Sequence, residues 1–300
     1  MKNKNVFLFL FSFVLFSSYF LYSQTITITN PTEDSKWRGT QTITWTVTNK
    51  TDQFRGITPS GSAGYYKIFY APEGTEIPGF EEEPSSPWEQ INGSIQDNGA
   101  IQSTYNLEWD TTGITADGWY IILIRAYDPP SGPCCEDEKV TFIVDNTPPN
   151  IEDPVFVPAT PNGSHGWYVT APEVTITVTD EPAGLRKNNT IRYKIGSLVK
   201  TISIGSEDTS GETTFVGIEG NKLEVWAYDA AVDNSGNPNE AYKGFSSYKV
   251  DLTPPTTGLS INYGKRTFTL NPKDETSGID WGNVFYEFTV SGAPQGSQQY

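Results

Sequence analysis

A six-residue segment occurs twice in the chain in closely related form, and its spacing constrains the fold more than any other feature. Val-Asp-Asn-Thr-Pro-Pro begins at Val144, and Val-Asp-Leu-Thr-Pro-Pro begins 106 residues later at Val250. This spacing is close to the length of one β-sandwich domain. Each copy follows a run of β-branched and aromatic residues, and its two prolines lack the N–H groups that a continuing strand needs. The repeat therefore predicts a string of domains joined by short, stiff Thr-Pro-Pro linkers.

Apolar and polar residues alternate along most of the chain after the first two dozen positions, and no stretch of helical length shows the 3.6-residue period. Residues that share a face in this pattern include Ile43, Trp45 and Val47, then Tyr66, Ile68 and Tyr70, and then Tyr120, Ile122 and Ile124. Turns rich in Gly and Pro separate most of these runs. We therefore predict an all-β fold of tandem Ig-like β-sandwich domains. Domain 1 is predicted at residues 24–146, domain 2 at 147–252 and an incomplete domain 3 at 253–300.

The second and third predicted domains share an internal repeat. Asp180 and Gly184 recur as Asp274 and Gly278, each pair 94 residues apart. A constant offset across a strand and its following turn indicates two copies of one unit. The third unit reaches Tyr300 without the later strands of the second, which would leave one apolar face uncovered. We therefore expect that the protein continues beyond this residue or that a partner completes the unit.

The first 23 residues have the layout of a secretory signal peptide. Lys2 and Lys4 precede an apolar run from Val6 to Phe16, and the small residue Ser23 marks the expected cleavage site. This order of basic, apolar and small residues predicts export and removal of residues 1–23. An uncleaved anchor is the alternative, because the longer segment from Val6 to Leu21 approaches the length of a short membrane span. We expect a protein that is secreted or held at the cell surface, with no transmembrane segment after cleavage.

The chain is strongly acidic, and this excludes some partners. Its formal net charge is −16, and the mature part without Lys2 and Lys4 carries −18. Such a charge disfavours binding to nucleic acid or to anionic lipid. Apolar residues make up only 36% of the chain, which suits sandwiches with thin cores.

Several segments resemble known repeat modules. The opening of domain 1 is similar to secreted Ig-like modules of fungal β-glucan-assembly proteins and of bacterial surface proteins. Later segments resemble the Ig-like and fibronectin-like repeats that are attached to exported bacterial enzymes and adhesins. The segments that carry these resemblances are 26–47, 105–112, 117–120, 126–128, 166–168 and 172–180. The resemblance implies a bacterial secreted or cell-surface protein with tandem sandwich repeats, and it implies nothing about chemistry.

Catalytic residues are not predicted. His165 is the single histidine and stands in a Gly- and Ser-rich turn, so a nucleophile would have no paired base in a triad. Two carboxylates for glycoside hydrolysis could be present among the 36 acidic residues, but the spacing singles out no pair. We therefore predict a protein that is not an enzyme and has no cofactor other than a metal ion.

Calcium is the ion that the sequence favours. Oxygen-bearing side chains crowd one loop, and hard cations take several such ligands. The predicted ligands are Asp229, Asp233, Asn234, Asn237 and Glu240, with Asn239 between them. The spacing does not fit an EF-hand. The alternative is a hydrated turn, which Asp, Asn and Gly favour through bonds to their own backbone.

The only two cysteines are the neighbours Cys134 and Cys135. They are too few for a zinc site of soft ligands. A vicinal disulfide is one interpretation for an exported protein, and two free or differently paired thiols is the other. Such a bridge would stiffen the loop from Asp128 to Asp137.

The segment from Ala71 to Ala100 is long and poor in strand signals, and it combines six glutamates with Phe80 and Trp88. Acids beside exposed aromatic rings could bind a sugar or a cationic partner. The alternative, which we favour for Trp88, is an indole packed into the sandwich, because tryptophan usually buries most of its area.

Two functions of different class fit the sequence. The first is a non-catalytic extracellular or cell-surface modular protein that acts as a spacer, in adhesion or in binding, with a cell-surface polysaccharide or protein as its partner. The second is a set of accessory modules, possibly carbohydrate-binding, at the N-terminus of a larger exported hydrolase. Tandem repeats and stiff linkers are consistent with the first, and sequence beyond Tyr300 would separate the two.

Overall fold

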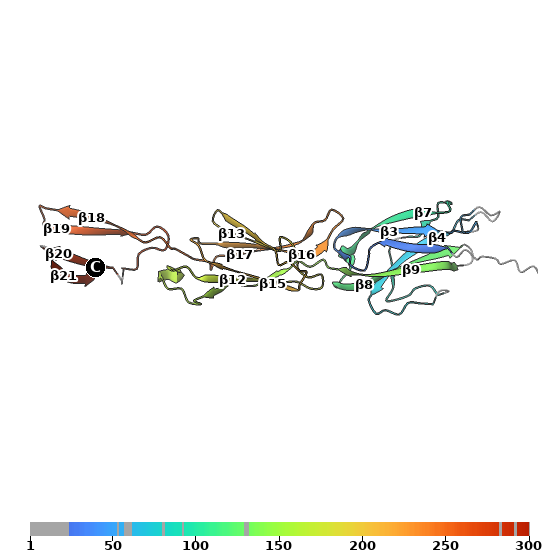
Figure 1. The fold of residues 1–300 in the computed structure, drawn as a ribbon, viewed down its shortest axis with the longest axis horizontal. Helices are drawn as coiled ribbons and strands as arrows, with labels where there is room; N and C mark the ends of the chain where they lie inside the picture. Colours follow the sequence, from blue (N-terminus) through green and yellow to red (C-terminus); the bar gives the residue numbers. More distant parts are fainter. Residues whose placement is uncertain are drawn as a thin grey trace, which may run out of the picture.

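The computed structural model describes residues 24–299 except 53, 57–61, 80–81, 92, 129–131, 282–283 and 291–292, and it describes only the backbone of 132–135, 286–290 and 293–299. The predicted signal peptide lies outside these residues. Figure 1 shows three β-rich units that follow one another along the long axis of the molecule. The names module 1, module 2 and module 3 refer below to residues 24–146, 147–252 and 253–300, the divisions proposed from the sequence.

Module 1 is a sandwich of two antiparallel sheets. One sheet has the order β1 (Thr25–Asn30), β3 (Thr40–Thr48), β7 (Ser103–Asp110). The other contains β9 (Gly132–Val144), β8 (Gly118–Asp128) and β4 (Tyr65–Pro72), with β5 (Glu89–Gln90) and β6 (Ile95–Gln96) on the outer side of β4. A short 3-10 turn, η1 (Thr111–Gly113), follows β7. The alternation predicted for β3 is confirmed, because Ile43, Trp45 and Val47 are fully buried between the sheets.

Module 2 repeats this plan. Its first sheet joins β10 (Asn150–Ile151) and β11 (Val155–Val157) to β12 (Glu173–Thr179), which pairs with β15 (Ser210–Val216). Its second sheet has β14 (Leu198–Ile202), β13 (Ile191–Ile195), β16 (Leu223–Val232) and β17 (Pro238–Phe245). A separate apolar core lies between these sheets, and it includes Ile176, Val225 and Tyr248. Modules 1 and 2 therefore each bury a core of their own, as the sandwich prediction requires.

Module 3 consists of two hairpins in the described part of the chain. β18 (Thr256–Asn262) pairs with β19 (Thr267–Lys273), and β20 (Phe285–Val290) pairs with β21 (Ala293–Gln299). Most side chains of the first hairpin are exposed. The prediction of an all-β fold with tandem sandwiches is confirmed by the sheets of modules 1 and 2.

One sheet crosses from module 1 into module 2. The two-residue strand β2 (Lys36–Trp37) pairs in parallel with β9 of module 1 on one side and with β16 of module 2 on the other. Trp37 lies opposite Val144 in the first pair and opposite Val232 in the second. The two modules therefore share a backbone hydrogen-bond network as well as a linker.

Trp88, in the long segment after β4, packs on the sheet that contains β4 and β8. Trp88 is 6% exposed and contacts a small apolar cluster with Phe69 and Leu123. Its indole Nε1 donates to the carbonyl oxygen of Glu76 at 3.0 Å. The predicted burial of Trp88 is confirmed, but its place differs from the prediction, because the indole packs in this separate cluster and not in the core between the two sheets. Phe80 lies outside the described residues.

Candidate metal centre

The hairpin between β16 and β17 docks module 2 against module 1. Asn234 Nδ2 donates to Thr42 Oγ1 at 2.9 Å, and Asn234 Oδ1 accepts from the Thr42 amide at 3.1 Å. Arg38 Nη1 donates to the carbonyl oxygen of Pro238 at 3.0 Å. Lys36 and Glu207 form an ion pair across the junction at 2.5 Å. These polar contacts surround a small buried apolar cluster that includes Ile143, Ala183 and Ala231.

Asp145, from the repeated six-residue segment, lies at the centre of this junction. Its Oδ1 accepts from the amide of Thr147 at 3.0 Å, which fixes the start of the linker. Its Oδ2 accepts from the amide of Ala183 in module 2, also at 3.0 Å. The aspartate therefore connects the end of module 1 to a turn of module 2.

Two further aspartates of module 2 point to the same place. Asp180 directly follows β12, and Asp229 lies in β16 just before its register shift. The three carboxyl groups of Asp145, Asp180 and Asp229 offer oxygen atoms that all lie within 4.8 Å of one another. Asp145 and Asp229 are fully buried, and Asp180 is 6% exposed. The junction thus gathers three acidic side chains that are far apart in the sequence into one buried cluster.

Burial and mutual repulsion disfavour the ionised form of all three groups. Burial is the largest cause in each, and it raises the pKa of Asp145 to about 6, that of Asp229 to about 7 and that of Asp180 to about 8. The negative charges of Asp145 and Asp229 add to the rise at Asp180, and backbone hydrogen bonds oppose it only in part. The three groups therefore hold their protons more readily than exposed carboxyl groups do, unless a positive charge lies beside them.

Neighbouring groups satisfy some of the carboxylate oxygens. Asn239 Nδ2 donates to Asp229 Oδ2 at 2.5 Å and to the carbonyl oxygen of Asp145 at 2.9 Å. Asp117 borders the cluster and adds a fourth acid beside Asp145. Arg38 is close enough to lower the pKa of Asp229, but its Nη1 donates to backbone carbonyls. Among the described residues, no lysine or arginine forms an ion pair with any of the three clustered carboxylates.

The ligand chemistry of the cluster is that of a hard cation. Carboxylate oxygens suit calcium, magnesium or manganese, whereas zinc and copper sites use imidazole or thiolate. A groove lined by Pro148, Asp180 and Ser210 lies beside the cluster. The three carboxyl groups themselves are buried, which keeps them from contact with a polysaccharide chain. The arrangement therefore suits cation binding better than glycoside hydrolysis.

The five calcium ligands predicted from the sequence do not converge. Asp229 belongs to the cluster, whereas Asp233 accepts from the amides of Ser235 and Asn237 within the hairpin turn, at 2.8 Å and 2.9 Å. Asn234 bonds to module 1, and the carbonyl of Asn237 accepts from Arg38. Glu240 is exposed and lies opposite Tyr228 in the strand pair. Four of the five thus lie in turn, docking or surface positions outside the cluster.

Asp145 and Asp180 were not predicted as ligands, although the sequence carried a signal for both. Asp145 stands in the repeated six-residue segment, and Asp180 recurs as Asp274, 94 residues later. Both were interpreted only as turn or linker residues.

The histidine and the two cysteines lie outside the acidic cluster. His165 is exposed in the short 3-10 turn η2 (Ser164–Gly166), as expected for a loop histidine. Cys134 and Cys135 lie in β9, and their side chains are outside the described part of the chain. Their pairing stays a prediction.

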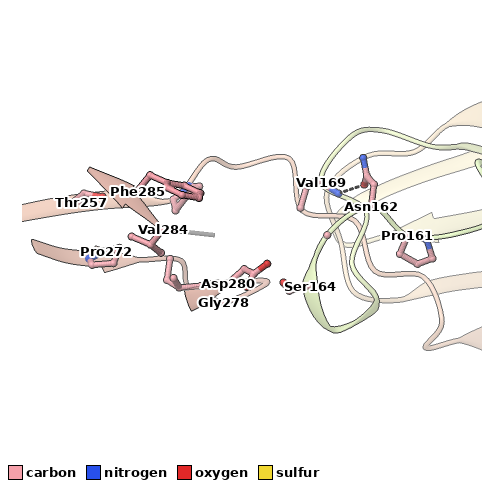
Figure 2. Close-up of a pocket in the computed structure, with 13 residues that line it drawn as sticks. Pro161, Asn162, Ser164, Val169, Thr257, Pro272, Gly278, Asp280, Val284 and Phe285 are labelled. Carbon is pink, nitrogen blue, oxygen red and sulfur yellow. Dashed lines mark hydrogen bonds between the residues drawn. The ribbon is translucent and has the colours of Figure 1, made fainter. Parts of the chain in front are cut away.

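The junction of modules 2 and 3 has a groove of about 610 Å³. Figure 2 shows that its lining comes from a loop of module 2, with Asn162 and Val169, and from module 3, with Pro272 and Phe285. The amide of Val169 donates to Asn162 Oδ1 at 2.9 Å. Among its described lining residues, Asp280 is the one acid, so this groove does not offer paired carboxylates.

Comparisons with known proteins find solved structures that are similar only at low sequence identity. No known protein family and no curated protein matches the sequence significantly. The fibronectin(III)-like modules of Clostridium thermocellum CbhA are 16% identical, with a TM-score of 0.28 over 73% of this chain and 91% of theirs. A 1.5-MDa bacterial ice-binding adhesin is 13% identical, with a TM-score of 0.32 over 80% of this chain and 69% of that one. A Ca²⁺-stabilised adhesin of an Antarctic bacterium is 14% identical, with a TM-score of 0.29 over 81% of this chain and 53% of that one.

These likenesses concern the fold and carry no information about ligands. Within the described residues, no helix has the length and apolar character that a membrane-spanning helix needs. In the described part of the chain, two β-sandwich units follow one another, and two β-hairpins follow them.

Proposed function

We propose that this protein is a non-catalytic extracellular or cell-surface modular protein whose sandwiches act as stiff spacers and present surfaces for adhesion. The observation that carries the proposal is the sheet that continues through β2 from module 1 into module 2. A spacer must keep its units in a fixed relative orientation, and shared backbone pairing does so more strongly than a linker alone.

The physical argument starts from the usual behaviour of tandem domains. Relative motion is the default for domains joined by a linker, unless the interface between them is well packed. Here the interface combines strand pairing at Trp37, the side-chain bonds of Asn234 and a buried apolar cluster around Ile143. The two prolines after Asp145 restrict the backbone of the connection further. Modules 1 and 2 therefore behave as one elongated body.

Export and surface location are part of the proposal. They are supported by the signal-peptide layout of residues 1–23 and by the acidic charge, which keeps an extracellular array soluble. The proposed partner is a cell-surface polysaccharide or protein. The non-catalytic role is supported by the burial of the three acids in a junction between modules, where a polysaccharide chain cannot reach them.

Small-angle X-ray scattering of residues 24–300 tests the spacer role. We expect the scattering of a rigid rod, with a distance distribution that ends sharply. Asn234→Ala removes two hydrogen bonds between the modules and should broaden this distribution, whereas Lys200→Ala on the exposed strand β14 should leave it unchanged. A broad distribution for the unmodified protein, equal to that of freely jointed domains, would contradict a stiff spacer. Hydrolysis of a polysaccharide by the same protein would contradict the non-catalytic role.

A further inference from the structure

The buried acidic cluster is the feature that the spacer fold does not explain. A sandwich junction can be closed by apolar contacts and neutral hydrogen bonds, as the neighbouring Ile143 and Ala231 show. Burial of three carboxylates within 4.8 Å of one another opposes folding, because each loses its hydration and repels the others. A structure that holds such a group needs a compensating positive charge or bound protons.

A second observation points to a ligand. Asp180 is only 6% exposed, and its buried Oδ2 atom has no hydrogen-bond partner among the described residues. The other two acids each accept hydrogen bonds, from Ala183 in the case of Asp145 and from Asn239 in the case of Asp229. A buried carboxylate oxygen without a donor costs stability unless something else binds it. The unpartnered oxygen belongs to the same cluster as the other two carboxylates.

We propose that Asp145, Asp180 and Asp229 together bind one calcium ion, and that this ion locks module 2 onto the end of module 1. Asp145 lies at the end of module 1, directly after β9, whereas Asp180 and Asp229 belong to module 2, so a shared ion joins the two modules directly. The inference deepens the spacer role and rests on it for its biological consequence, but ion binding is measured independently of it.

Calcium fits this cluster better than the other common cations. The clustered ligands are oxygen atoms, and Ca²⁺ accepts irregular sets of six to eight oxygens from carboxylates, carbonyls and water. Mg²⁺ requires near-ideal octahedral geometry and usually keeps several of its waters, which a buried site with three converging acids does not favour. Asp117, beside Asp145, and solvent from the groove at Asp180 can complete the coordination.

The second junction repeats part of this design. Asp251 accepts from the amide of Thr253 at 3.0 Å and from the amide of Ser277 at 2.9 Å, which reproduces both backbone bonds of Asp145. Asp274 stands where Asp180 stands in module 2. In the described part of the chain only the first junction brings a third acid to the pair. The second junction therefore supplies a matched control within the same protein.

Isothermal titration of the chelator-treated protein, residues 24–300, with calcium chloride tests the proposal. We expect one saturable site with a Kd between about 10⁻⁵ M, the weak limit of calcium sensors, and about 10⁻³ M, the weak limit of extracellular modules. Asp180→Asn should weaken binding by about ten-fold or more, since affinity depends on the number of charged ligands. Asp274→Asn, at the equivalent position of the second junction, should leave the first site unchanged. Asp233→Asn should also leave it unchanged, and a loss there would favour the hairpin loop instead.

Thermal unfolding gives a second readout that a purely structural role would not produce. In chelator, Asp180→Asn should unfold at the same temperature as the unmodified protein or at a higher one, because the neutral amide avoids the cost of an ionised carboxylate buried beside two other acids. In excess calcium the order should reverse, because only the unmodified protein gains from the ion.

The outcomes that overturn the proposal are distinct from those that overturn the spacer role. Absence of calcium binding up to about 10 mM, far above the expected Kd, would overturn the site while leaving the scattering result intact. Equal affinity for magnesium would overturn the choice of ion. If Asp180→Asn lowers the unfolding temperature equally with and without calcium, the carboxylate has a structural role only and the proposal fails.

Discussion

Module 1 contains a buried ion pair whose removal gives a sharp test of how its sandwich is stabilised. Lys50 and Asp97 have side chains with no exposed area, and Nζ lies 2.6 Å from Oδ2. The same Oδ2 accepts from the hydroxyls of Tyr66 and Tyr105 at 3.0 Å and 2.7 Å, and Oδ1 accepts from the amide of Gly99 at 2.8 Å. The pair is thus the centre of a hydrogen-bonded network inside the apolar core.

Lys50→Met should destabilise module 1 by about 3 kcal/mol. Methionine has nearly the same length and fills the space, so the main effect is the loss of the positive charge beside a buried carboxylate. Breaking a buried pair by removing one partner costs about 3–5 kcal/mol. The lower end applies here, because Asp97 keeps three donors from Tyr66, Tyr105 and Gly99.

The double variant Lys50→Met/Asp97→Asn separates charge from packing. An asparagine at position 97 still accepts hydrogen bonds from the two tyrosines but carries no charge. We expect the double variant to be more stable than Lys50→Met alone by about 1–2 kcal/mol, since the unbalanced charge is gone. Lys67→Met breaks the ion pair of Lys67 with the half-exposed Glu83 and should cost less than about 1 kcal/mol.

Urea unfolding followed by hydrogen exchange on peptides from β3 and β7 reports on module 1 separately from module 2. A loss of less than about 1 kcal/mol for Lys50→Met, the level of an exposed pair, would refute the reasoning. So would a double variant that is no more stable than the single one, because the cost would then come from packing and not from charge.

Two further predictions concern acid stability and a glycine turn. Burial raises the pKa of Asp97, but the bonds from Lys50, Tyr105 and Gly99 outweigh it and lower the pKa overall. The stabilisation from the lowered pKa is present above pH about 4, the pKa of Asp97 in the unfolded chain, and is lost as the pH falls through its pKa in the folded protein. The urea midpoint of module 1 should therefore decrease at acid pH, and Asp97→Asn should make this decrease smaller. Gly184→Ala should cost about 2–3 kcal/mol, because its φ is +74° and the new Cβ would lie 3.1 Å from the carbonyl oxygen of Glu207. Gly196→Ala, with φ of +57° and open space around it, should cost only about 1 kcal/mol. If urea unfolding shows that both glycine variants lose the same free energy of unfolding, the close contact at Gly184 is contradicted.

The sandwich was predictable because its signal is local. Ile43, Trp45 and Val47 alternate with threonines along one strand, and the alternation alone decides which face is buried. The burial of Trp88 followed from residue type, since an indole gains more from packing than from solvent. Neither inference required knowledge of which strands pair.

The junction was not predictable, because its parts are individually ordinary. β2 contains only Lys36 and Trp37, too few residues to show a period, yet it joins the sheets of two modules. Asp233 and Asn234 have the composition of a calcium loop, and the same side chains equally suit a turn and a docking contact. Only the folded arrangement distinguishes these uses, because it depends on residues of module 1 such as Thr42.

In both copies of the repeated segment, the aspartate connects one module to the next. From the sequence, its prolines are the stiffening residues, whereas the structure gives the connecting role to the aspartate. Asp145 and Asp251 each bond forward to the linker and onward to the next module, although the second partner lies 38 residues away in one case and 26 in the other. The same hydrogen bond forms at both spacings. It therefore depends on the position of the turn that follows Asp180 or Asp274, and not on the number of residues between the aspartate and that turn. The aspartate of the segment is therefore the residue that defines the geometry between neighbouring modules, and at the first junction Asp229 adds the third carboxylate that allows an ion to reinforce it.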